Sequence, residues 1–187
     1  MSTAKLIESL LVINLMLICN ISIAAPQNIL LKTESCLSCH SDPGLSTNPL
    51  QPSLDGQNSS YLISQLISFD DGSRIHGKVD VRVLELSKQE TLSLAAFFAE
   101  RLPKESTQKN TGMLLGTSKY NTCIGCHGVG GEGLGNYPRL AGLQPAYISK
   151  QLMDYKNKKR PNDTMRVIAQ KLSDQDIAKL ASYIGSL

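Results

Sequence analysis

The 187-residue chain is long enough for one domain of ordinary size or for two small ones. Charged residues make up 19% and hydrophobic residues 41% of it, with a net charge of +3, which is typical of a globular protein and excludes a disordered or collagen-like chain. The chain has no Trp and 3 Phe, so little aromatic mass is available for a core, and a bulky bound group would supply the missing volume.

The first residues have the pattern of a secretory signal peptide. Lys5 precedes an apolar run at 10–18, and small residues follow at 22–25. We place cleavage after Ala24, so that residues 1–24 form the signal peptide. A retained membrane anchor is the alternative, but the run contains an asparagine and falls short of the roughly 20 apolar residues of a spanning helix. We therefore expect export and no integral membrane span after cleavage.

Cys19 leaves with the signal peptide, and the other four cysteines form two C-x-x-C pairs, each followed by a histidine. The two motifs are Cys36, Cys39 and His40, and Cys123, Cys126 and His127. Two thiols one helical turn apart can each add to a haem vinyl group, and the adjacent histidine then faces the iron. A four-cysteine zinc site or two disulfides are alternatives, but both leave the histidines unexplained. The sequence therefore predicts two covalently attached haem c groups.

The sequence contains a tandem repeat of one unit. From position 52 onward, residues recur at a constant offset of 86, and the two CxxCH motifs recur at an offset of 87. We assign residues 25–103 to the first domain, the polar stretch 104–111 to a linker and residues 112–187 to the second domain. The pairs that recur at 86 include Leu54 and Leu140, Tyr61 and Tyr147, Gln65 and Gln151, Arg74 and Arg160, and Leu94 and Leu180.

Each copy has the pattern of short helices with long connections. Ser87 and Glu90 resemble a capping box ahead of a helix with one apolar face, and Ser173 and Asp176 repeat it near the C-terminus. A middle helix is expected around 61–66 and its repeat, whereas the glycine-rich loop after the second CxxCH motif cannot be regular structure. No alternating strand pattern is present, so the predicted fold class is all-α.

At this point the chain resembles the dihaem class I cytochromes c of the cytochrome c4 type. The residues that carry the resemblance are the two CxxCH motifs, Gly128 with its glycine loop, and segments at 138–142, 147–152 and 165–173. The resemblance implies a periplasmic electron carrier with two haem domains packed face to face. It also implies that the carbonyls of Pro138 and Pro52 orient the histidines of the two motifs.

The two copies differ at the sixth ligand of the iron. Met165 lies on the expected loop ahead of the last helix and matches the family's distal methionine, whereas the residue at the same offset in the first copy is Val79. No methionine lies between Cys36 and Gly112. Three alternatives remain for the first haem, which are His76, Lys78 and an open, five-coordinate iron.

The net charge is divided unequally between the copies. Residues 25–103 hold 6 Lys and Arg against 9 Asp and Glu, whereas residues 104–187 hold 12 against 6. The difference is concentrated at the loop Lys156 to Arg160, which is either a solvated basic loop or a docking patch for an acidic partner protein. Nucleic acid is not an expected partner of an exported haem protein.

These observations favour an electron shuttle between a donor and a terminal acceptor such as a membrane oxidase. A histidine and methionine pair raises the potential of the second haem. The alternative is a redox enzyme, or the haem subunit of one, with chemistry at a first haem that lacks a methionine ligand. The sequence offers no acid–base cluster around that haem, so enzymatic activity is the less favoured hypothesis.

Overall fold

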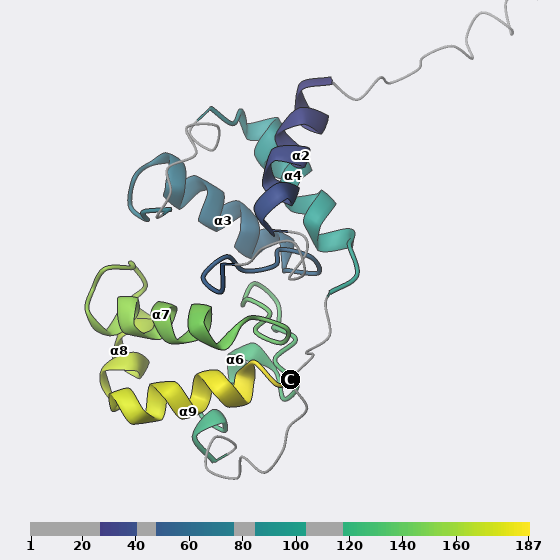
Figure 1. Cartoon of the computed structure of the whole chain (residues 1–187). Coiled ribbons are helices and arrows are strands. Elements are labelled where there is room, and N and C mark those ends of the chain that lie inside the picture. The colour runs from purple at the N-terminus through teal and green to yellow at the C-terminus, as the bar shows by residue number, and fades with distance from the viewer. Residues whose placement is uncertain (1–26, 41–47, 77–84, 104–117) are drawn as a thin grey trace, which may run out of the picture.

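The computed structural model describes residues 27–40, 48–76, 85–103 and 118–187. The predicted signal peptide 1–24 and the predicted linker 104–111 lie outside the described residues. Within them the regular elements are all α-helices, as predicted, and Figure 1 shows that they form two groups, one above the other. No helix in the described part of the chain is both long and apolar enough to cross a membrane.

The first group consists of α2 (Gln27–His40), α3 (Ser59–Asp70) and α4 (Lys88–Glu100). Helix α3 begins where the Asn58 side chain accepts a hydrogen bond from the backbone N–H of Tyr61. The predicted capping box of Ser87 and Glu90 is present at the start of α4 and satisfies two backbone N–H groups. Helix α4 packs against both α2 and α3. The buried residues of this core are Leu62, Leu94, Ala95 and Phe98.

The second group consists of α6 (Ile124–His127), α7 (Pro145–Lys156), α8 (Asp163–Gln170) and α9 (Asp174–Ile184). Helix α7 packs against both α8 and α9. The predicted capping box of Ser173 and Asp176 is present at the start of α9. Pro145 is in the first turn of α7, where the backbone N–H that proline lacks would have no partner within the helix. The buried residues of this core are Tyr120, Ile148, Leu152, Ile177, Leu180, Ala181, Tyr183 and Ile184.

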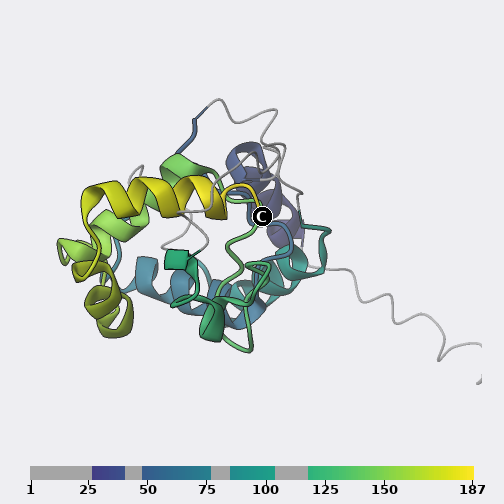
Figure 2. The same ribbon diagram turned by 90° about the horizontal axis from the view of Figure 1, so that it is seen from below.

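The two cores share no residue, so the described structure consists of two domains with separate interiors. Seen from below in Figure 2, the second domain lies in front of the first. Helices α3 and α7 occupy equivalent places in the repeat and face each other across the interface. Gln57 joins the domains nearby, because its side chain donates to the Arg139 carbonyl and accepts from the Arg139 N–H, at 2.9 and 2.8 Å.

Candidate haem-binding sites

The CxxCH motif of the second domain is held in a tight helical turn. Cys123 is the N-cap of α6, and His127 is its last residue. The hydroxyl of Tyr120, a residue that is 2% exposed, donates a hydrogen bond of 2.8 Å to the carbonyl of Gly128 just after the motif. The helix geometry therefore places both cysteines and the histidine on one short, anchored segment.

The glycine-rich loop returns the chain to the histidine. The N–H of Gly133 donates to the carbonyl of His127 at 2.8 Å, and Gly133 has a φ of +79°, which favours glycine. A Cβ atom at this position would lie 2.6 Å from the carbonyl oxygen of Tyr137. The glycine therefore allows the backbone to approach closely enough for Pro138 to reach the histidine ring.

The Pro138 carbonyl fixes the His127 ring, as the family resemblance implied. A carbonyl oxygen can only accept, so Nδ1 of His127 carries the proton and donates at 2.9 Å. The other ring nitrogen, Nε2, then has a free lone pair for a metal ion. Burial lowers the pKa of His127, and the hydrogen bond to Pro138 opposes this change.

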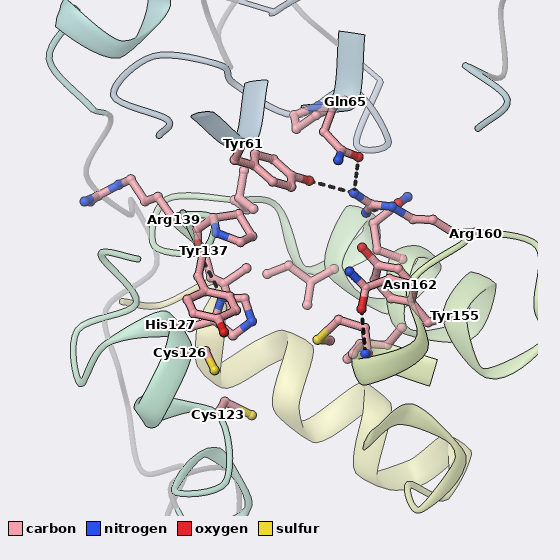
Figure 3. A pocket seen from close by; sticks show the side chains of 18 of the residues that line it. Tyr61, Gln65, Cys123, Cys126, His127, Tyr137, Arg139, Tyr155, Arg160 and Asn162 are labelled. Atoms are coloured by element: carbon pink, nitrogen blue, oxygen red, sulfur yellow. Dashed lines mark hydrogen bonds between the residues drawn. The ribbon is translucent and has the colours of Figure 1, made fainter. Parts of the chain in front are cut away.

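A cavity of about 330 Å³ connects His127 with Met165. Cys123, Cys126, His127 and Met165 all line it, and Figure 3 shows the side chain of Cys126 next to His127, with Cys123 beyond it. Apolar side chains of the second core, including Leu152 and Leu180, form other parts of the wall. These features suit a large apolar group that is attached through sulfur and whose metal is bound by side chains of the cavity wall.

Met165 lies on a helix, and the prediction of a loop at this position was wrong. It is in the first turn of α8, and the side chain of Asn162 accepts a hydrogen bond of 2.8 Å from its backbone N–H. This N-cap starts a helix of eight residues that the sequence pattern did not reveal. The first turn of α8, capped by Asn162, therefore holds the backbone of Met165 in place.

The first domain repeats the arrangement of motif and proline. Residues 36–40 form the last turn of α2, and Nδ1 of His40 donates to the carbonyl of Pro52 at 2.8 Å. Both histidines therefore have the hydrogen bond that the resemblance implied. Burial lowers the pKa of His40, the bond to Pro52 opposes the change, and His76 contributes a further lowering.

His76 lies close to the motif histidine of the same domain. The ring centres of His40 and His76 are 6.0 Å apart, with an angle of 70° between the ring planes. The His76 ring also packs edge to face against Phe69 at 4.8 Å. The other two residues of interest for this haem, Lys78 and Val79, lie outside the described part of the chain.

Two arginines that are equivalent in the repeat, Arg74 and Arg160, join the domains. Arg160 donates to Gln151 in its own domain at 2.6 Å, and across the interface to Tyr61 and Gln65, both at 2.7 Å. The last two bonds are visible in Figure 3. Arg74 makes the equivalent set, donating to Gln65, to the hydroxyl of Tyr147 and to Gln151.

The basic loop of the second domain exposes fewer charges than the sequence indicated. Arg160 is 6% exposed and faces the first domain, so it takes no part in a docking patch. Lys156 is bound to the Leu172 carbonyl and to Asp174. Lys158 and Lys159 remain exposed. Because a helix end uses Lys156 and the domain interface uses Arg160, the exposed basic residues of this loop are Lys158 and Lys159.

The alternatives to haem attachment do not fit the geometry. The two CxxC pairs belong to different domains, the four cysteines are not disulfide-bonded, and among the described residues no three His, Cys, Asp or Glu side chains are grouped to hold a metal ion. Two helical domains, each with a CxxCH motif whose histidine is fixed by a proline carbonyl, define a dihaem c-type cytochrome.

Comparison with known proteins agrees with this class. The Cytochrome c family matches residues 115–187. Cytochrome c4 of Pseudomonas aeruginosa is 32% identical over 171 residues, which cover 83% of this chain and 85% of that protein. A thiosulfate dehydrogenase electron acceptor of Thiomonas intermedia is 28% identical over 81% of this chain and 78% of that protein.

The solved structure of cytochrome c4 from Acidithiobacillus ferrooxidans matches with a TM-score of 0.76 and 30% identity, over 83% of this chain and 99% of that chain. The chain belongs to the cytochrome c4 family, and its function is electron transfer through two covalently attached haem c groups.

Proposed function

We propose that the protein is an exported electron shuttle in which each CxxCH motif binds one haem. Cys36 and Cys39 would attach the first haem, with His40 as the proximal ligand. Cys123, Cys126 and His127 would serve the second haem in the same way, with Met165 on its opposite face. Bound haem supplies an iron that is reduced and reoxidised by one electron. The chain's own residues hold the iron ligands in place and exclude water.

The observation that carries the proposal is the cavity of the second domain. His127 and Met165 both line it, as do the two cysteines of the motif, and its wall continues onto Tyr61, Gln65 and Arg74 of the first domain. The second haem would therefore lie against the domain interface. This placement supports transfer between the two haems, because electrons would pass through the packed interface and not through solvent.

The buried guanidinium of Arg160 also supports the fit of a haem. It lines the same cavity, and within the described residues no carboxylate is within ion-pair distance of it. A buried charge without a counter-ion is costly. The carboxylate groups that haem carries on one edge would supply the missing negative charge.

The location and partners follow from the same proposal. The signal-like N-terminus supports a periplasmic location. A dehydrogenase, by analogy with the relative named as a thiosulfate dehydrogenase electron acceptor, would be the donor, and a terminal oxidase in the membrane would be the acceptor. The exposed Lys158 and Lys159 would meet an acidic surface on one of these partners.

Haem counting tests the attachment sites. Protein made with a haem-attachment system should be heavier than the apo-chain by two haems and should keep its colour in acid–acetone. Replacing Cys36 and Cys39 by Ala should remove one haem, and replacing Cys123 and Cys126 should remove the other. Cys19→Ser should leave the mass of the mature protein unchanged, because this cysteine leaves with the predicted signal peptide. Extraction of the colour, or retention of two haems in either double variant, would refute the proposal.

A further inference from the structure

The internal repeat shows which position of the second domain is equivalent to that of His76 in the first. The Arg74 guanidinium lies 4.6 Å from the centre of the Phe69 ring, and the Arg160 guanidinium lies 4.7 Å from the centre of the Tyr155 ring. Both pairs are related by the offset of 86, so the two copies are in register up to these arginines. The residue two places after Arg74 is His76.

The equivalent of His76 in the second domain lies on the wall of the cavity. Asn162 stands two places after Arg160, lines the cavity with His127 and Met165, and caps α8. Figure 3 shows its side chain hydrogen-bonded to the first turn of that helix. A side chain at this position is therefore close to the distal side of a haem that is bound to the motif histidine.

The spacing of the two histidine rings suits one metal ion between them. An imidazole nitrogen binds a metal at about 2 Å and lies about 1 Å from its ring centre, so two imidazoles on opposite faces of one ion have centres about 6 Å apart. The observed separation of His40 and His76 is 6.0 Å. A direct hydrogen bond of about 2.9 Å between ring nitrogens would bring the centres to about 5 Å. The spacing is therefore longer than a direct hydrogen bond gives and leaves room for one metal ion between the two rings.

We propose that His40 and His76 are the two axial ligands of the first haem iron. The inference rests on the proposed attachment of a haem at Cys36 and Cys39. Nδ1 of His40 is engaged by Pro52, which leaves Nε2 for the iron. Phe69 packs against the His76 ring and limits its rotation. The first haem would be low-spin and would have a lower potential than the second, because a methionine ligand raises the potential of a haem and a second histidine does not.

This difference in potential would give electron transfer within the molecule a direction. Electrons that enter at the first haem would move to the second, which holds them more strongly. The first haem would also resist small exogenous ligands, because both axial positions of its iron are filled by strong protein ligands. The proposal thus assigns electron transfer, and not catalysis, to the domain that lacks a methionine.

Spectroscopy of the intact two-haem protein tests the assignment. Near-infrared magnetic circular dichroism of the oxidised wild type should show one bis-histidine haem and one histidine–methionine haem in equal amounts. The reduced wild type should bind almost no carbon monoxide. His76→Ala should bind close to one carbon monoxide per chain, and added imidazole should compete for that site. His76→Met should double the intensity of the sulfur–iron absorption band of the oxidised protein.

The control is Ile75→Ala, at a neighbouring position that is 80% exposed, which should leave the spectra of both haems unchanged. Every variant should still contain two haems by mass. A wild-type protein without a haem at Cys36 and Cys39 would refute the proposed attachment site, which is a different result from a wrong choice of axial ligand. Rapid binding of one carbon monoxide by the wild type, or a histidine–lysine signature in its near-infrared spectrum, would overturn the assignment of His76. The wild-type spectrum decides the question even if a variant fails to fold.

Discussion

The guanidinium of Arg160 donates a hydrogen bond of 2.7 Å to the hydroxyl of Tyr61, although the two residues lie 99 positions apart in the chain. The repeat reverses the relationship, because Arg74 donates to the hydroxyl of Tyr147 at 3.3 Å. Each domain thus offers the other the same donor and acceptor, as in the two-fold interface of a homodimer. Because one unit is repeated in the sequence, equivalent residues of the two domains exchange partners across the interface.

The first prediction concerns this interface. Arg160→Gln removes the guanidinium that reaches Tyr61 and Gln65 and should lower the free energy of unfolding by roughly 2–3 kcal/mol, since hydrogen bonds to charged groups are the stronger ones. Urea denaturation of the two-haem protein measures this change. Arg166→Gln is the control, because Arg166 pairs with Asp163 on its own helix; it should cost less than about 1 kcal/mol. Equal losses in the two variants would contradict a bridging role.

The second prediction concerns the support of the second CxxCH motif. Tyr120→Phe removes the buried hydroxyl that donates to the Gly128 carbonyl and should destabilise the protein by about 1 kcal/mol, because that carbonyl keeps only the longer bond of 3.3 Å from the N–H of Gly131. Tyr137→Phe, at a side chain that is 49% exposed, should change the free energy of unfolding by less than about 0.5 kcal/mol. Denaturation curves at constant haem content provide the comparison. No difference between the two variants would show that the hydroxyl of Tyr120 is dispensable.

The third prediction concerns the distal ligand of the second haem. Met165→Ala should abolish the long-wavelength sulfur–iron absorption band and lower the potential of one haem only, because the methionine is the proposed ligand. Met153→Ala is the matched control: Met153 also packs against the second core, but it does not line the cavity, and the band should persist. A redox titration with optical detection gives both readings. Wild-type intensity that corresponds to two methionine-bound haems would show that the alignment of the repeats is wrong.

The fourth prediction is a pH dependence from the two capping boxes. Glu90 accepts hydrogen bonds from Lys32 and from Ser87, and these lower its pKa from 4.5 to about 2. Asp176 accepts from Ser173 and Lys119, and its pKa falls from 3.8 to about 2. Both carboxylates have a lower pKa in the folded state than in the unfolded one. They therefore stabilise the fold fully above about pH 4.5, and this contribution is lost as the pH falls toward 2.

Unfolding by urea at pH 6 and pH 3 measures this contribution. Glu90→Gln should reduce the difference in stability between the two pH values, because the variant has no charge to lose at that cap. Glu100→Gln, at the other end of α4, is the control and should leave the difference as in the wild type. An unchanged difference in Glu90→Gln would rule out the capping carboxylate as a source of the acid sensitivity.

The sequence by itself determined the features that depend on neighbouring residues. The two CxxCH motifs, the repeat and the boxes at Ser87 and Ser173 could be read directly, because haem attachment and helix capping act over a few residues. The fold class followed from the same local patterns. The hydrogen bonds from His40 and His127 to proline carbonyls were also expected, through the resemblance to a known family.

Only the tertiary structure decided how the two copies meet and which residues line the cavity of the second domain. The sequence showed that Arg74 and Arg160 are equivalent, but not that each crosses to the other domain, because this depends on the orientation of α3 and α7. Met165 was assigned to a loop, although the Asn162 cap begins a helix there. His76 was one of three alternatives for the first haem, and our proposal that it is the ligand rests on a ring that lies 6.0 Å from that of His40. Contacts between segments far apart in the chain leave little trace in sequence periodicity, since they follow from the packing of whole helices.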